Sequence, residues 1–361
     1  MQERRGGRLR VALIFGGQSA EHDVSLRSAQ TVMNALDPDR YEVVPIGIDR
    51  EGRWLAGGDP FAALTAASPL FALGDGAPAG PASDVAERSL PEVFSGRFDV
   101  VFPVLHGPMG EDGTLQGLLE LTGVPYVGAG VLGSAVAMDK AMAKTVLAQT
   151  GLPQAPWRLV TRKEWERDPD GIVAGLGRAL GFPCFVKPAN MGSSVGVVKA
   201  HDASELPGAL AEAARFDRRI VVEQGIDARE LEVAILGNDE PIASVVGEIV
   251  PSREFYDYEA KYVDEGSQLL APAPIDPDTM AQIQELGIAA FKALDLCGLA
   301  RIDFFMDRNT DQIYINEANT IPGFTAISMY PILWEASGIP LPELVDRLIG
   351  LALERSLERR G

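Results

Sequence analysis

The stretch LARIDFFMDRNTDQIYINEAN (299–319) decides how the second half of this chain folds. Two apolar runs, 299–306 and 313–319, flank the polar hexapeptide DRNTDQ, which is the pattern of a β-hairpin. With the turn centred on the middle of that hexapeptide, Asp303 lies directly opposite Glu317. The sequence therefore predicts two carboxylates facing each other across neighbouring strands.

The hairpin carries its polar side chains in a pattern that allows two interpretations. Because side chains alternate between the faces of a strand, Arg301 lies beside Asp303, and Glu317 lies beside Asn319. Facing carboxylates repel each other, and with an amide oxygen nearby they suit Mg²⁺, which prefers oxygen ligands and substrate phosphates. The alternative is a solvated acidic face. Asn316, on the other face, fits neither interpretation and leaves the register open.

Length, charge and cysteine content narrow the class of protein. The 361 residues can form two or three domains. A net charge of −19 argues against nucleic acid or an anionic membrane as a partner. The two cysteines show no metal or disulfide spacing, which favours a reducing cytosol. The apolar run VALIF near the N-terminus is too short for a signal peptide or a membrane span.

The first 130 residues alternate apolar runs with helical patterns, which indicates an open α/β domain. The expected strands are 10–15, 41–49, 98–107 and a short one at 124–129; the expected helices are 23–36 and 113–122. Ligands of such domains bind at the carboxyl ends of the strands, where GGQSAEHD and HGPMGEDG lie. The Ala-, Gly- and Pro-rich residues 56–90 predict a peripheral excursion or a long loop.

The rest of the chain predicts a mixed antiparallel sheet with helices, unlike the first part. Besides the hairpin, the expected strands are 182–188, 195–200, 220–226 and 231–238, and the expected helices are 134–149, 276–295 and 341–358. No internal repeat is visible.

A loop of small residues, NMGSSVG (190–196), separates two of these strands. Successive backbone N–H groups in such a loop can cradle phosphate oxygens, although a P-loop would end in GK[ST] and continue as a helix. The alternative is an ordinary hairpin loop. Lys187, just before the loop, either extends to solvent or contacts phosphate, and we favour phosphate. Lys140, on a predicted helix, reads by itself as a surface lysine.

Several other polar residues remain ambiguous. Glu223 and Glu230 end and begin successive strands, so each is either a solvated strand end or, for Glu230, a ligand of ribose hydroxyls. Glu21 binds either a helix N-terminus or a substrate ammonium. The segment YDYEAKY (256–262) is either a lid that excludes water or an amphipathic surface loop. For His106 we favour a hydrogen-bonded histidine at a strand end over acid–base catalysis.

These motifs, in this order, resemble the D-alanine–D-alanine ligases of the ATP-grasp superfamily over nearly the whole chain. The most specific are HGPMGEDGTLQG and the run from Gly298 through RID, NEANT and Pro322-Gly323, supported by GGQSAEHDVS, GSSVGV and YDYEAKY. The departures are Asp23, where glutamate is common, and the long 56–90 segment. Neither lies at an inferred catalytic position.

The resemblance implies a three-domain ATP-grasp fold. An N-terminal open parallel α/β domain (1–130) would bind the amino end of D-alanine. A central α+β domain (131–223) and a C-terminal α+β domain (224–361) would clasp ATP. It also implies a homodimer in the cytoplasm that acts on two D-alanine molecules for peptidoglycan synthesis, with no nucleic-acid or membrane partner. The implied cofactors are ATP and two Mg²⁺ ions, with Mn²⁺ as a substitute.

The resemblance also assigns roles to individual residues. It gives Mg²⁺ to Asp303, Glu317 and Asn319; the phosphates to Lys140, Lys187 and, on lid closure, Lys261; the adenine-reading hinge to Glu223, Gln224, Gly225 and Ile226; and the ribose to Glu230. On the substrate side it gives the first ammonium to Glu21, the second carboxylate to Ser328, the oxyanion to Arg301 and the Gly323 N–H, and the link from Glu21 to the lid to Ser193 and Tyr262.

The implied reaction is ATP-dependent peptide bond formation through an acyl phosphate. The alternatives are a depsipeptide ligase that joins D-alanine to D-lactate, which the residue at Tyr262 disfavours, and another ATP-grasp carboxylate–amine ligase, which would lack GGQSAEHDVS. A non-catalytic nucleotide-binding regulator would lack Arg301 or the metal ligands. A Rossmann dehydrogenase is disfavoured because no GxGxxG follows the first strand.

Overall fold

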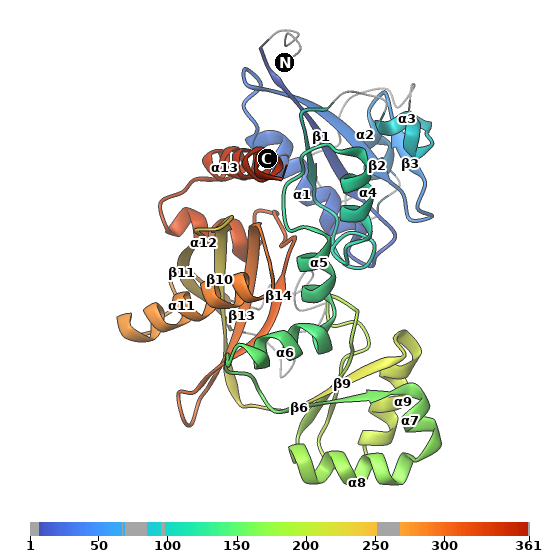
Figure 1. The fold of residues 1–361 in the computed structure, drawn as a ribbon, viewed down its shortest axis with the longest axis vertical. Coiled ribbons are helices and arrows are strands. Elements are labelled where there is room, and N and C mark those ends of the chain that lie inside the picture. The colour runs from blue at the N-terminus through green and yellow to red at the C-terminus, as the bar shows by residue number, and fades with distance from the viewer. Residues whose placement is uncertain (1–6, 67, 69–84, 95–97, 251–267, 360–361) are drawn as a thin grey trace.

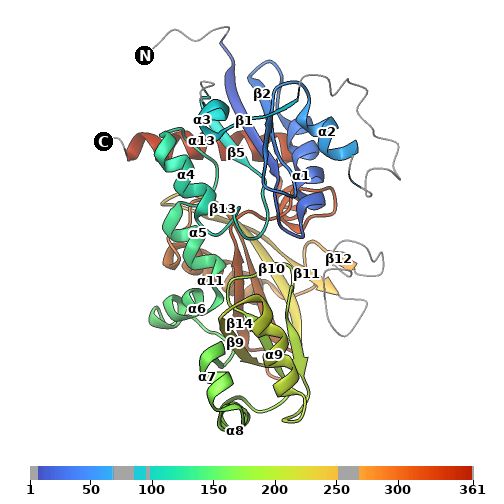
Figure 2. The same ribbon diagram turned by 90° about the vertical axis from the view of Figure 1, so that its right-hand side faces the viewer.

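Three β-sheets lie one after another along the long axis of the molecule in this computed structural model (Figures 1 and 2). The structure describes residues 7–66, 68, 85–94, 98–250 and 268–359. The predicted lid, including Lys261 and Tyr262, lies outside the described residues.

The N-terminal sheet has the strand order β4-β3-β2-β1-β5. Its parallel strands are β1 (Leu9–Gly16), β2 (Tyr41–Ile48) and β5 (Val100–Pro103); the antiparallel edge is formed by β3 (Trp54–Ala56) and β4 (Ala86–Glu87). The central strand β1 is buried, as an apolar run between two parallel neighbours should be. The predicted open α/β sheet is therefore present, with a mixed edge.

Four helices accompany this sheet: α1 (His22–Ala35), α2 (Pro60–Ala66), α3 (Leu90–Phe94) and α4 (Thr114–Thr122). Two predictions need correction here. The 56–90 segment is not simply a loop, because α2 packs Phe61 and Leu64 into the hydrophobic core. The strand expected at 124–129 is only one bridge between Val101 and Tyr126, since no further residues pair.

The helix predicted at 134–149 is in fact two helices, α5 (Val131–Met138) and α6 (Lys140–Gln149). Asp139 separates them in an extended conformation, and its side chain accepts a hydrogen bond from the Met142 N–H. Aspartate is a favourable N-cap because its oxygen satisfies a backbone N–H of the first turn. The break makes Lys140 the first residue of α6.

The central sheet is antiparallel throughout, in the order β6-β9-β7-β8. Its strands are β6 (Trp157–Thr161), β9 (Arg219–Gln224), β7 (Cys184–Pro188) and β8 (Val198–Ala200), with helices α7 (Arg162–Arg167), α8 (Pro169–Leu180) and α9 (Leu206–Phe216). Strand β6 and these three helices were not predicted from the sequence. The sheet and helices enclose a hydrophobic cluster of their own, which includes Val186, Leu206 and Val222.

The C-terminal sheet is also antiparallel, in the order β12-β11-β10-β13-β14. Its strands are β12 (Gln268–Leu270), β11 (Ile242–Val250), β10 (Ala228–Gly237), β13 (Gly298–Asp307) and β14 (Ile313–Asn319), and α11 (Pro277–Ala293) packs against it. Strands β13 and β14 form the predicted hairpin, and Asp303 pairs with Glu317 as expected. The register shifts directly afterwards, because Phe304 pairs with Ile315 and Asn316 is the extra residue of a β-bulge.

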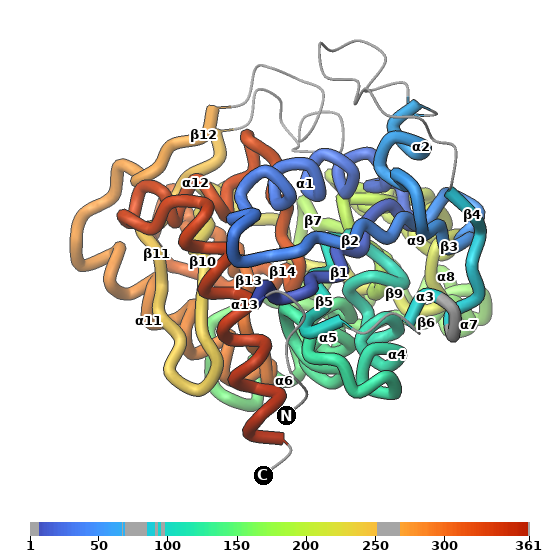
Figure 3. The backbone as a smooth tube through the Cα atoms, turned by 90° about the horizontal axis from the view of Figure 1, so that it is seen from above, coloured from blue at the N-terminus to red at the C-terminus, as the bar shows by residue number. Residues whose placement is uncertain are grey.

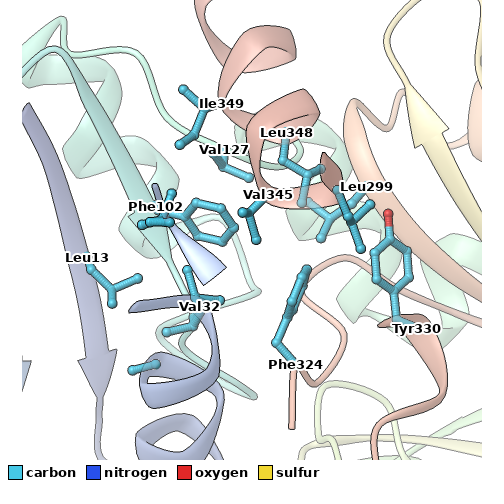
Figure 4. Packing of buried hydrophobic residues seen from close by; sticks show 14 of the residues in the cluster. Leu13, Val32, Phe102, Val127, Leu299, Phe324, Tyr330, Val345, Leu348 and Ile349 are labelled. Atoms are coloured by element: carbon cyan, nitrogen blue, oxygen red, sulfur yellow. The ribbon is translucent and has the colours of Figure 1, made fainter. Parts of the chain in front are cut away.

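The last two helices join the C-terminal part of the chain to the N-terminal sheet. Helix α12 (Met329–Ala336) packs on β10 and β11, and α13 (Leu341–Glu358) contacts α1 and β5 as well as β10 and β13; Figure 3 shows both helices from above. Phe324 and Tyr330 pack toward Phe102 of β5 in one hydrophobic cluster, with the Phe102 and Phe324 rings 6.1 Å apart (Figure 4). The two outer parts of the chain thus share a core, whereas the central sheet has a separate one. Within the described residues, no helix is long and apolar enough to cross a membrane.

Candidate active site

A cleft of about 790 Å³ lies where the three sheets meet. Its lining comes from the central sheet, the C-terminal sheet and the loops at the carboxyl ends of β1 and β5. The sequence-predicted site residues that line it are Glu21, Lys140, Lys187, Ser193, Glu223, Gln224, Gly225, Ile226, Glu230, Arg301, Asp303, Glu317, Asn319, Gly323 and Ser328. The remaining two, Lys261 and Tyr262, are outside the described residues.

The β13–β14 hairpin presents its carboxylates to this cleft. Arg301 donates two hydrogen bonds to Asp303, from Nε at 2.7 Å and from a terminal nitrogen at 2.8 Å. Asn319 Nδ2 donates to Asp303 at 2.9 Å, and Glu232 from the neighbouring strand approaches Arg301 Nε at 3.0 Å. On the opposite strand, Glu317 lies 3.6 Å from Lys140 Nζ. We call Asp303, Glu317, Glu232, Arg301 and Lys140 the hairpin cluster.

The bulge explains the residue that the sequence pattern could not place. A strict period of two would turn Asn316 away from Glu317, but the extra residue disrupts that alternation. Asn316 lines the cleft as well, and its Oδ1 lies 3.5 Å from Lys187 Nζ.

A second charged group lies deeper, on the central sheet. Lys187 Nζ on β7 donates to Glu223 Oε2 on β9 at 2.7 Å, and Lys144 Nζ on α6 lies 3.1 Å from Glu223 Oε1. Burial alone would raise the pKa of Glu223, but the charges of Lys144 and Lys187 outweigh it and lower that pKa to about 2. We call these three residues the lysine cluster. Lys144 was missed by sequence reasoning, although it follows Lys140 by one helical turn.

The hinge between the two sheets that face the cleft is short. Residues 225–227 connect β9 to β10, and the Gly225 N–H donates to Pro183 O at 2.8 Å. A side chain at Gly225 would approach Pro183 O to within 2.7 Å, so this position requires glycine. The Glu223 side chain points into the lysine cluster, whereas Gln224, Ile226 and Glu230 follow along the cleft wall.

Glu21 lies where the N-terminal loops meet the glycine loop of the central sheet. A Cβ added at Gly107 or at Gly192 would each lie 3.5 Å from its Oε2, so the carboxylate sits between two glycine backbones. Its side chain makes no capping hydrogen bond to α1. Next to Gly192, Ser193 and Ser194 adopt positive φ angles of 48° and 59°, a strained conformation that is frequent at ligand sites.

A turn after β14 brings small polar groups to the same end of the cleft. The Ser328 hydroxyl lies 2.8 Å from the Thr325 hydroxyl and accepts from the Thr325 N–H at 3.0 Å. A Cβ at Gly323 would come within 2.6 Å of Ser328 Oγ, so a side chain there would displace the Ser328 hydroxyl.

His106 and Glu111 stand behind this turn. His106 is hydrogen-bonded to Ile321 O and Ser28, and burial lowers its pKa, in agreement with a neutral, hydrogen-bonded histidine. Glu111, which sequence reasoning did not single out, accepts from the N–H groups of Gly107 and Ile321. Burial and the nearby charge of Glu21 raise the pKa of Glu111 to about 8.

The donor set of the hairpin fits a hard divalent cation. Two carboxylates and an amide lie together, which suits Mg²⁺ shared with phosphate oxygens. They do not form an all-protein metal cage, since no group of three or more His, Cys, Asp or Glu side chains placed to hold a metal occurs in the described ranges.

Two family models match the sequence. The model described as "D-ala D-ala ligase N-terminus" matches residues 10–129, and "D-ala D-ala ligase C-terminus" matches residues 146–350. Among curated proteins, the chain is 50% identical over 357 residues to the D-alanine–D-alanine ligase of Heliobacterium modesticaldum, covering 97% of this chain and 96% of that one. It is 52% identical over 357 residues to the enzyme of Thermoanaerobacter pseudethanolicus, covering 97% and 98%.

Solved structures agree with these matches. The D-alanine–D-alanine ligase from Coxiella burnetii superposes with a TM-score of 0.80 at 38% identity, covering 98% of this chain and 97% of that one. The VanG D-Ala:D-Ser ligase from Enterococcus faecalis superposes with a TM-score of 0.83 at 34% identity, covering 96% and 99%.

Proposed function

The chain belongs to the D-alanine–D-alanine ligase family, and we propose from the geometry of its cleft how it carries out that family's reaction. It has the ATP-grasp fold and catalyses ATP-dependent formation of D-alanyl-D-alanine for peptidoglycan synthesis. The observation that carries the proposal is that the lysine cluster and the hairpin cluster lie next to each other at one cleft. Asn316, the neighbour of Glu317, bridges them, because its Oδ1 lies 3.5 Å from Lys187 Nζ.

In the first step the carboxylate of one D-alanine attacks the γ-phosphorus of ATP and releases ADP. Two anions must meet, so the site has to concentrate positive charge. We assign Lys187 and Lys140 to the phosphate oxygens; Lys144 and Lys187 both pair with Glu223, which supports the position of Lys187. We assign the hinge Glu223–Ile226 to the adenine and Glu230 to the ribose.

We assign Mg²⁺ to Asp303, Glu317 and Asn319. When bound there, the ion would neutralise phosphate charge during transfer. Arg301 pairs with Asp303, and Lys140 lies near Glu317, so cationic side chains of the chain itself flank the proposed ligands.

In the second step the amine of another D-alanine attacks the carbonyl carbon of the acyl phosphate, and the tetrahedral intermediate expels phosphate. Glu21 would hold the first ammonium between Gly107 and Gly192, and Ser328 would hold the second carboxylate. Arg301 and the Gly323 N–H would stabilise the oxyanion, and removing one such donor typically slows a reaction about 10²–10³-fold.

The remaining assignments are also proposals. Lys261 and Tyr262 would close over the nucleotide, and Ser193 would link Tyr262 to Glu21, because an acyl phosphate needs protection from water. We further propose domains at 1–130, 131–223 and 224–361, Mn²⁺ as a substitute for Mg²⁺, and a cytoplasmic homodimer.

Phosphate release and product analysis test the proposal. With ATP and Mg²⁺, D-alanine should give one phosphate per D-alanyl-D-alanine, and L-alanine should give neither. Mixtures of D-alanine with D-lactate or D-serine should still yield mainly D-alanyl-D-alanine. A D-Ala:D-Ser product, as named for the Enterococcus relative, or a depsipeptide as main product would contradict the assignment of the second substrate.

A further inference from the structure

The turn 321–324 carries the proposed oxyanion donor Gly323. Side chains of the N-terminal part of the chain form hydrogen bonds to the backbone of this turn. Ile321 N–H donates to Glu111 Oε1 at 3.0 Å, and Ile321 O lies 2.9 Å from His106 Nδ1. Phe324 N–H donates to Ser28 Oγ at 3.1 Å. These contacts join residues about 200–300 positions apart in the sequence.

One protonation pattern satisfies the whole network. A carbonyl oxygen only accepts, so His106 Nδ1 carries the proton and donates to Ile321 O, and Nε2 is an acceptor. The Ser28 hydroxyl can then donate to Nε2 across 3.3 Å while its oxygen accepts from Phe324 N–H. The lowered pKa of the buried His106 agrees with this neutral ring. The ring of His106 and the hydroxyl of Ser28 thereby both have partners on the turn and on each other, which favours one fixed arrangement.

These hydrogen bonds leave one backbone N–H of the turn available for substrate. Ile321 and Phe324 give their N–H groups to Glu111 and Ser28, and Pro322 has none. Of the four residues, that leaves Gly323, whose N–H has no acceptor within the described part of the chain.

We propose that Ser28, His106 and Glu111 are positioning residues that hold the Gly323 N–H at the reacting carbonyl. The inference rests on the oxyanion role proposed above for Gly323. It makes the N-terminal part, which also carries Glu21, responsible both for binding the first amino acid and for placing the donor that polarises it. A misplacement of about 1 Å can lower a rate by about 10²-fold.

The competing explanation is that apolar packing alone fixes the turn. Phe324 is fully buried, and its ring lies near Phe102 and Tyr330 (Figure 4). If that packing is sufficient, the hydrogen bonds of Ser28 contribute only to stability.

Ser28→Ala with Ser25→Ala as the matched control separates the two explanations. Both serines are fully buried on α1, and Ser25 Oγ likewise accepts from a backbone N–H, that of Gly16, and donates to Val104 O. The difference is that the partners of Ser25, at the end of β1 and just after β5, lie within the N-terminal part of the chain.

For Ser28→Ala we expect kcat to fall about 10–100-fold with KM for ATP changed less than about twofold. Slower amine attack leaves the acyl phosphate to water, so ADP released per dipeptide should rise above one. Hydrogen exchange, followed by mass spectrometry over residues 320–326, should be faster than in Ser25→Ala. Glu111→Gln should also lower kcat and speed exchange, because an amide nitrogen replaces one of the two acceptor oxygens. This variant tests the proposal if Ser28→Ala does not fold.

Equal kcat, equal coupling and equal exchange in Ser28→Ala and Ser25→Ala would overturn the proposal. A wild-type enzyme that makes no dipeptide would instead contradict the proposed function. In that case, hydrogen exchange over residues 320–326 that is no faster in Ser28→Ala than in Ser25→Ala would still refute the positioning role of Ser28.

Discussion

The lysine cluster and the hairpin cluster lie close together at one cleft, yet they have opposite net charge. In the first, two ammonium groups share the single carboxylate of Glu223. In the second, three carboxylates meet two cationic side chains. The cleft therefore attracts an anion on one wall and a cation on the other, which is the charge pattern of a magnesium nucleotide.

Burial distinguishes the clusters further. The side chains of Lys144 and Glu223 are 2% and 3% exposed, whereas those of Asp303 and Glu317 are 13% and 29% exposed. A buried charge that loses its partner remains unsolvated, so it destabilises the protein strongly. A partly exposed carboxylate can exchange its partner for water or a metal ion. The comparison teaches that the charges of Lys144 and Glu223 are tied to folding, while those of Asp303 and Glu317 are available for chemistry.

The largest effect should come from the hairpin cluster, as lost activity with retained stability. We expect Asp303→Asn to lower the rate of ADP release by about 10³-fold or more, because a charged group that acts on the transferring phosphate is lost. Its unfolding midpoint in urea should stay close to that of the wild type. The control is Asp307→Asn on the same strand, which should retain activity. The Asp307 carboxylate accepts hydrogen bonds from backbone N–H groups of the hairpin turn. Normal turnover in Asp303→Asn would remove the metal assignment.

The lysine cluster should respond in the opposite way. We expect Lys144→Met to lower the free energy of unfolding by about 3 kcal/mol, because Glu223 loses one of its two buried partners. Lys292→Met changes an exposed lysine on α11 and should have almost no effect. Adding Glu223→Gln to Lys144→Met should recover part of the stability, which a double-mutant cycle in urea would measure. A Lys144→Met protein as stable as Lys292→Met would show that the two clusters do not differ in this respect.

Acid should reveal the same contrast. The pKa of Glu223 is lowered to about 2, so its stabilising contribution is present above the ordinary value near 4.5 and is lost as the pH falls toward 2. The difference in unfolding free energy between wild type and Glu223→Gln should therefore shrink by about 2 kcal/mol between pH 6 and pH 3. A constant difference in unfolding free energy across this range would mean that Lys144 and Lys187 do not lower the pKa of Glu223.

The smallest effect should come from the contact between the clusters. Asn316 reaches Lys187 at 3.5 Å, a long and weak hydrogen bond. We expect Asn316→Ala to lower kcat/KM for ATP by about two- to fivefold, the equivalent of about 0.5–1 kcal/mol, with little change in stability. A loss as large as that of Asp303→Asn would show that Asn316 itself touches the reacting groups.

Sequence reasoning predicted the hairpin cluster better than the lysine cluster, for a physical reason. The period of two along a strand, together with a short turn, fixes which residues face each other, so the Asp303–Glu317 pair followed from local pattern. The bulge at Asn316 did not, because it depends on how the strands twist in the sheet. Likewise, the grouping of Lys144, Lys187 and Glu223 requires three elements to meet, and no local pattern contains that information.

The fold shows the same division. The final helix, predicted at 341–358, matches α13 because a long amphipathic pattern carries its own signal. The helix predicted at 134–149 was wrong at Asp139, where one capping side chain outweighed the continuing apolar pattern. The short antiparallel strands of the central sheet were partly missed, because their burial comes from neighbours contributed by distant segments.

The shared core of the two outer parts has a consequence for building chimeric enzymes. Because Phe102, Phe324 and Tyr330 pack together, the N-terminal sheet and the segment from Phe324 to the final helix form one common interior. Exchanging either half alone between relatives would mismatch that interior. The middle segment, roughly Trp157 to Gln224, brings its own interior and would transplant together with α6, whose buried Lys144 pairs with Glu223.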